Sequence, residues 1–128
     1  MSKGDYMYLN RMRVHNRPEY MKFEREVWRP LAEAMIQSGS LKAWSFHTLV
    51  LPGGTDVPIT AVSADVFGKW DALFQSTGTQ EAWKTAHPNK DYNEAFQLLP
   101  KLRDLARREL YVVEERVTAS PTTVSQKQ

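Results

Sequence analysis

Residues 41–67 read LKAWSFHTLVLPGGTDVPITAVSADVF, and this stretch decides the fold. Two runs rich in β-branched and aromatic residues, 41–51 and 59–67, flank a short segment of Pro, Gly and Asp. Such a pattern predicts two strands joined as an antiparallel hairpin. Both runs place apolar side chains on both alternating sets of positions. A strand that is apolar on both faces is buried on both faces, so this sheet is expected to be covered on each side.

The rest of the chain predicts two more strands and several helices. Residues 6–15 and 108–117 alternate as strands do. Apolar residues spaced three or four apart are typical of amphipathic helices, and they occur over 18–38, 69–76, 80–86 and 92–106. In the first of these helices, charged residues including Glu24 are expected on the polar side, and Pro30 predicts a kink near residues 26–30. Asp91 is expected to cap the last helix.

This order of elements, β-α-β-β-α-β, predicts a ferredoxin-like α+β fold over residues 1–117. A four-stranded antiparallel sheet carries the helices on one face, and right-handed crossovers put the first and third strands in the middle. Because the helices cover only one face, a second copy of the sheet is the economical cover for the other. Residues 118–128, rich in Ser, Thr and Gln, are expected to be a disordered tail.

In addition to this order of elements, three short sequence segments resemble those of a known superfamily. Residues 24–30, 51–56 and 108–111 are similar to those of uncharacterised bacterial proteins among the dimeric α+β barrels. These include antibiotic-biosynthesis-monooxygenase-like and NIPSNAP-like proteins, and the resemblance spans residues 6–117. It implies a homodimer with a small-molecule pocket. The superfamily holds cofactor-independent oxygenases, haem-degrading enzymes, lyases, isomerases, cyclases and members of no known activity, so the resemblance does not choose a reaction.

Composition narrows the functional classes. The 128 residues include no cysteine, which excludes disulfides, thiolate nucleophiles and cysteine-ligated metal sites. The 17 basic and 15 acidic residues leave a net charge of only +2, which gives no reason to expect a nucleic-acid partner. No window approaches the roughly 20 apolar residues of a membrane helix, and no signal-peptide core is recognisable. A cytoplasmic protein without a membrane partner is expected.

Polar residues on the predicted strands are candidates for catalysis. His47 is the candidate general base, because imidazole changes charge near neutral pH. In one hairpin register His47 shares a face with Asp65 and could form a dyad, whereas in the other it faces Val62 and the dyad disappears. Asn10 or an arginine such as Arg13 could stabilise an oxyanion. The alternatives are a hydrogen-bonded structural histidine, an Asp65 paired with Arg11 or Arg13, and arginines at an interface.

Aromatic residues are candidates for a binding pocket between helices and sheet, although any single one of them is more often simply part of the core. The candidates are Tyr8, Trp28, Trp44, Trp70, Phe74, Trp83, Tyr92 and Phe96. His87, in a loop before Pro88, is a further candidate ligand for substrate or haem iron, or a capping residue. The histidines show no close metal-ligand spacing, so no metal site is assigned. Arg107 and Arg108 are expected to be solvated.

Three functions are therefore open. The working hypothesis is an enzyme without an organic cofactor that performs acid–base chemistry on an apolar or aromatic carbonyl substrate, leading to oxygenation, isomerisation or cyclisation. A second is haem binding or degradation, with His87 or His47 as the iron ligand. A third is a non-catalytic ligand-binding or interaction module.

Overall fold

The computed structural model describes residues 3–54, 56–74 and 76–119. Most of the predicted tail, 120–128, lies outside these residues and stays a prediction. The strands are β1 (Tyr6–Val14), β2 (Ala43–Thr48), β3 (Ala61–Phe67) and β4 (Arg103–Val112). They form one antiparallel sheet in the order β2-β3-β1-β4, so the first and third strands lie in the middle. This confirms the predicted ferredoxin-like α+β architecture.

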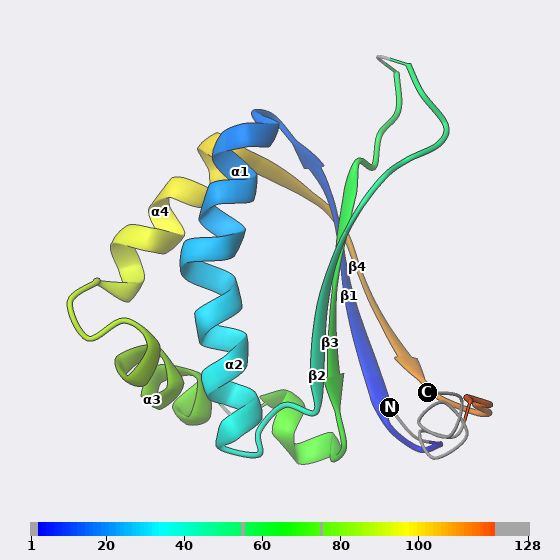
Figure 1. Ribbon diagram of the computed structural model, residues 1–128, viewed down its shortest axis with the longest axis vertical. Coiled ribbons are helices and arrows are strands. Elements are labelled where there is room, and N and C mark those ends of the chain that lie inside the picture. The colour runs from blue at the N-terminus through cyan, green and yellow to red at the C-terminus, as the bar shows by residue number, and fades with distance from the viewer. Residues whose placement is uncertain (1–2, 55, 75, 120–128) are drawn as a thin grey trace, which may run out of the picture.

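The helices gather on one face of the sheet, and Figure 1 shows the opposite face bare. They are α1 (Arg17–Phe23), the π-helical turn η1 (Glu24–Trp28), α2 (Arg29–Gln37), the 3₁₀ turn η2 (Trp70–Phe74), α3 (Ser76–Ala86) and α4 (Tyr92–Leu102). No helix within the described ranges has the length and apolar character needed to cross a membrane. Among the described residues, helices therefore cover one face of the sheet and none covers the other.

The first helical segment contains a π turn where the sequence predicted a kink. The N–H of Arg29 donates to the carbonyl oxygen of Glu24, five residues back. Pro30 follows directly, and its ring would clash with the carbonyl four residues earlier in a regular α-helix. The wider turn lies where that clash would fall, and α1, η1 and α2 continue as one rod (Figure 1).

The predicted boundary between the last helix and the last strand is wrong. The helix was expected to reach residue 106, but α4 ends at Leu102 and β4 begins at Arg103. Two physical causes favour the strand. Pro100 removes a backbone donor near the helix end, and β4 pairs with β1 over its whole length, from Val14 opposite Arg103 to Tyr6 opposite Val112.

The two hairpin strands are also shorter than predicted. β2 ends at Thr48 and β3 begins at Ala61, so residues 49–60 form an arm that extends past the sheet (Figure 1). Val50 and Leu51 in this arm are 87% and 78% exposed. The apolar character that suggested longer strands is thus left without a covering layer in the single chain.

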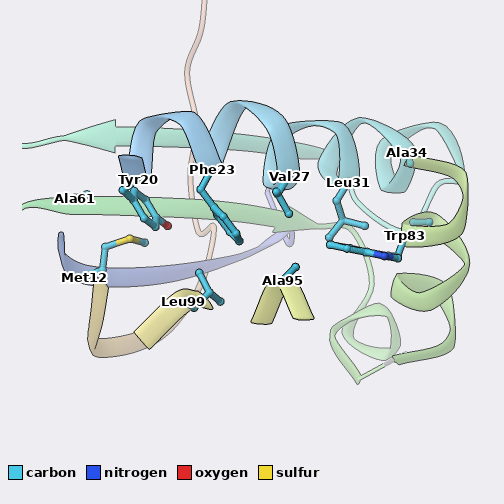
Figure 2. Packing of buried hydrophobic residues seen from close by; sticks show 11 residues of the cluster. Met12, Tyr20, Phe23, Val27, Leu31, Ala34, Ala61, Trp83, Ala95 and Leu99 are labelled. Carbon is cyan, nitrogen blue, oxygen red and sulfur yellow. The ribbon is translucent and has the colours of Figure 1, made fainter. Parts of the chain in front are cut away.

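The main core lies between the helical face of the sheet and the helices. Figure 2 shows side chains from the α1–α2 rod pointing toward those of the strands, α3 and α4. The labelled members are Met12, Tyr20, Phe23, Val27, Leu31, Ala34, Ala61, Trp83, Ala95 and Leu99.

Asp91 caps α4, as predicted, since its Oδ2 accepts the N–H of Glu94 at 3.1 Å. A cavity lies beside the core, toward the middle of the sheet.

Candidate functional site

A cavity of about 260 Å³ lies between the sheet and the α1–α2 rod. Its apolar wall includes rings and aliphatic side chains from the helices and strands, and its polar groups come from both layers as well. The lining residues used below are Asn10, Tyr20, Glu24, Trp28, Trp44, Ser63, Asp65, Phe96, Arg103 and Arg108. This volume lies just below the range of roughly 300–1,000 Å³ usual for ligand pockets. A small organic molecule is the matching occupant.

Strand register brings the polar groups of β1 and β3 together. Asn10 lies opposite Ser63, and Tyr8 lies opposite Asp65. Because alternate residues share a face, Asn10, Ser63 and Asp65 all lie on the helical side of the sheet. The amide Nδ2 of Asn10 donates to Ser63 Oγ at 3.2 Å. An amide has two N–H groups, so one remains for a ligand.

Glu24 is the most deeply buried carboxyl group of the cavity, with 3% of the residue exposed. The hydroxyl of Tyr20 donates to its Oε1 at 2.9 Å. Burial raises the pKa of Glu24 to about 7; the Tyr20 hydrogen bond and the Arg103 charge oppose this, and the Asp65 charge adds to it. Burial also raises the pKa of Tyr20, so its hydroxyl keeps its proton. Glu24 is thus poised to exchange a proton near neutral pH.

Asp65 is a second titrating group in the same cavity. Burial raises its pKa to about 6. At pH 7 it is therefore mostly ionised, while Glu24 is about half protonated. Two carboxyl groups of different pKa in one cavity can divide the roles of base and acid between them.

His47 does not join this site. The hairpin register places His47 opposite Val62 and Trp44 opposite Asp65, so His47 and Asp65 lie on opposite faces of the sheet. Its Nε2 lies 2.8 Å from Ser45 Oγ on the bare face, where the imidazole is exposed. The alternative register, without a His47–Asp65 dyad, is the one that the chain adopts.

The arginines of β1 also lie away from the cavity. Arg13 is exposed and its Nη1 donates to the carbonyl oxygen of Val57 in the hairpin arm. Arg11 forms an ion pair with Glu109 on the bare face rather than with Asp65. The predicted pairing of Asp65 with an arginine of β1 is therefore wrong. A catalytic role for Arg13 gains no support from its position.

The aromatic candidates divide into three groups. Trp28, Trp44 and Phe96 line the cavity. Trp83 is a core residue, and Tyr92 contacts Trp83 edge-on and Phe96 in a tilted arrangement. Tyr8 packs against the smaller cluster around Leu41, and Trp70, half exposed, contacts Tyr6 edge-on. The side chain of Phe74 lies outside the described part of the structure.

His87 is buried in the helical layer rather than in the cavity. Its Nε2 lies 2.8 Å from the carbonyl oxygen of Val27, and its ring packs against Trp83. Since His47 is on the other face of the sheet, neither histidine is placed to bind iron in this cavity. Across the described ranges, no three metal-ligating side chains cluster together.

Three charged residues that line the cavity, Glu24, Arg103 and Arg108, were not predicted to be site residues. Glu24 was assigned to the polar side of its helix, but it follows Tyr20 by four and precedes Val27 by three, so it lies within the apolar stripe. That spacing was a usable signal, because a carboxyl group among apolar residues is costly unless it has partners. Arg103 was placed inside a helix. Arg108 is exposed, as expected, and it also lines the cavity. Their positions depend on the start of β4, which the sequence did not reveal.

Comparison with solved structures finds the same architecture elsewhere. A mutant of SnoaB, a cofactor-independent oxygenase from Streptomyces nogalater, matches with a TM-score of 0.53 and 16% identity, over 91% of this chain and 99% of SnoaB. An EthD-family protein from Bacillus halodurans gives 0.56 and 10%, over 84% of this chain and 95% of that protein. HapK from Hahella chejuensis gives 0.53 and 10%, over 90% and 98%. The shared feature is the fold.

Sequence identities this low show a shared fold and nothing more. No family model and no curated protein matches the sequence. These solved structures share the predicted α+β fold with this chain.

Proposed function

We propose that the cavity is the active site of an enzyme that uses no organic cofactor and performs acid–base chemistry on a small apolar or aromatic carbonyl compound. The observation that carries this proposal is the convergence of two carboxyl groups, the buried Glu24 and the partly buried Asp65, on one aromatic-walled cavity with the amide of Asn10. SnoaB, which has this fold, is a cofactor-independent oxygenase, and that favours the same class of chemistry.

The first step is removal of a proton from carbon next to the carbonyl group. Asp65, ionised at neutral pH, is the base, and it takes the role that the sequence suggested for His47. The free N–H of the Asn10 amide stabilises the enolate oxygen as charge develops there. Trp28, Trp44 and Phe96 hold the apolar part of the substrate. The resulting carbanion can react with oxygen, rearrange or cyclise, and all three outcomes require this same step.

Hydrogen–deuterium exchange tests the first step without knowledge of the natural substrate. We expect the protein to accelerate exchange of the acidic C–H of 2-tetralone in D₂O, followed by proton NMR. Asp65→Asn should lower the enzyme-dependent rate by roughly 100-fold or more, the usual contribution of a general base. Asp71→Asn, at an exposed carboxylate of η2, is the matched control and should leave the rate unchanged.

The same assay separates the competing functions. His47→Ala should retain the exchange rate, because that side chain lies across the sheet from the cavity. Binding of 2-tetralone without any accelerated exchange would contradict the enzyme and favour a ligand-binding module. Equal rates for the wild type and Asp65→Asn would remove Asp65 from the mechanism.

We also propose that two copies pair through the bare face of the sheet. That face carries partly exposed apolar residues of the central strands, including Met7, Leu9 and Val62, together with the Arg11–Glu109 ion pair. The exposed Val50 and Leu51 of the arm offer further apolar surface to a partner. Apolar strand positions on both faces are typical of a sheet covered on both sides.

A further inference from the structure

Two buried polar atoms have no hydrogen-bond partner among the described residues, and both belong to residues that line the cavity. They are Glu24 Oε2 and Arg103 Nε. Buried polar groups in folded proteins are nearly always hydrogen-bonded, and an exception requires an explanation. Here the neighbouring cavity supplies one, because a bound molecule would complete both sets of hydrogen bonds.

Both atoms are donors in the relevant protonation state. The Nε of arginine carries a proton and cannot accept. Glu24 Oε1 already accepts the Tyr20 hydroxyl at 2.9 Å. When the Glu24 carboxyl is protonated, its proton is therefore free to sit on Oε2 and be donated into the cavity. Two donors, one of them positively charged, match an acceptor that carries negative charge.

We propose that the ligand of this cavity carries a carboxylate, held by the Nε–H of Arg103 and the protonated carboxyl of Glu24, with its apolar part against Trp28 and Trp44. This inference deepens the proposed function and rests on its assignment of the cavity as the binding site. The substrate class becomes an aromatic or apolar carbonyl compound with an acidic group.

Protonation of Glu24 then controls binding. The ionisable groups that face it are Tyr20 from α1, Asp65 from β3, and Arg103 and Arg108 from β4. Tyr20 stays neutral and the arginines stay charged near neutral pH, so the cavity charge varies only with the two carboxyl groups. As Glu24 ionises, it loses its donated proton and repels a carboxylate. Binding is therefore expected to weaken as the pH rises through about 7.

Calorimetric titration with 2-naphthoate and with its neutral isostere 2-naphthamide tests the charge preference. At pH 6.5 the wild type should bind the carboxylate at least roughly tenfold more tightly. Arg103→Gln should abolish this preference. Arg103→Lys keeps the positive charge and should retain part of the carboxylate preference. This variant also serves as a control for loss of the fold. Arg107→Gln is the matched control, since Arg107 pairs with Glu109 on the other face of β4 and should not matter.

Glu24→Gln tests the proton. The wild type should lose roughly eightfold in naphthoate affinity between pH 6.5 and pH 8, since the binding-competent fraction falls as Glu24 ionises. The glutamine amide donates at every pH, so Glu24→Gln should flatten this dependence. Glu26→Gln, at an exposed neighbour in η1, should behave as the wild type does.

Several results would overturn the inference. Three results would do so: equal affinity for the two probes, binding of neither probe, or a carboxylate preference that survives Arg103→Gln. Each would show that water alone accepts the hydrogen bonds of these two donors. The exchange assay keeps the two proposals distinct. Carboxylate preference together with binding of 2-tetralone but no accelerated exchange refutes the enzyme and leaves the anion site standing, whereas exchange without carboxylate preference does the reverse.

Discussion

Glu24 links the proposed chemistry to the stability of the fold. Its pKa is about 7 in the folded protein against 4.5 ordinarily, and a rise of about 2.5 corresponds to about 3 kcal/mol. The folded protein holds this proton more tightly than the unfolded chain. The contribution of Glu24 to stability is therefore greatest below pH 4.5 and declines as the pH rises toward 7. Asp65 acts in the same direction toward pH 6.

Glu24→Gln is expected to raise the free energy of unfolding by about 2–3 kcal/mol at pH 8 and to change it little at pH 4. The amide fits the same space and its oxygen still accepts the Tyr20 hydroxyl. Urea denaturation at both pH values measures the difference between variant and wild type, which cancels the titration of all other groups. Glu26→Gln should give no such pH-dependent gain. A gain of equal size at both pH values would show that ionisation of Glu24 is not the cause.

Single residues differ in how far sequence alone could place them. Asn10 and Asp65 were candidates because a polar group on a buried strand needs a partner, and both line the cavity. His47 could not be placed, because one residue of hairpin register moves it to the other face, and the loop does not determine that register. Glu24 could have been identified as a buried residue from its spacing of four from Tyr20. The charged residues beside it in the same helix obscured this signal.

At the scale of elements, α4 depends on its cap. Asp91 Oδ2 accepts the Glu94 N–H at 3.1 Å, and the helix places Ala95 and Leu99 in the core. Asp91→Ala is expected to lower the free energy of unfolding by about 1 kcal/mol, the usual value of an N-cap. Asp91→Asn should cost much less, because asparagine caps equally well. Chemical denaturation of the two variants checks this, and equal losses would point to charge at the helix end rather than to the hydrogen bond.

Element type was predictable, but element boundaries were not. Alternation and helical spacing gave the right kind of structure for residues 6–15 and 18–38, since both patterns are local. The start of β4 was missed because residues 103–106 continue a helical spacing of apolar groups. What makes them a strand is pairing with β1, a partner about ninety positions away in sequence. The π turn before Pro30 likewise avoids a steric clash between the proline ring and the backbone, and that clash becomes apparent only in three dimensions.

At the scale of the whole molecule, layering was the most predictable property. The order of elements and the known handedness of crossovers leave few arrangements, and the sheet order β2-β3-β1-β4 follows from them. Two-sided apolar strands added a second expectation, a covered outer face. No described helix covers that face (Figure 1), so the expectation concerns an assembly rather than the chain itself.

A charge at the centre of that face should prevent assembly. The wild type is expected to show twice the mass of one 14.8-kDa chain in light scattering at micromolar concentration. Leu9, half buried on β1, lies between Ala64 of β3 and Glu109 of β4. Leu9→Glu would bury an unpaired carboxylate at the interface and repel Glu109, so the mass should fall to that of one chain.

Leu98→Glu is the matched control, because Leu98 is an equally large exposed side chain on α4, in the helical layer across the sheet from that face. Its mass should remain that of two chains. Tyr111→Lys, at the exposed edge of the outer face, provides a milder disruption if Leu9→Glu does not fold, which circular dichroism would reveal. A wild type with the mass of one chain would refute the pairing. So would a Tyr111→Lys or a folded Leu9→Glu variant that keeps the mass of two chains, since two sheets in contact cannot accommodate either charge without loss of affinity.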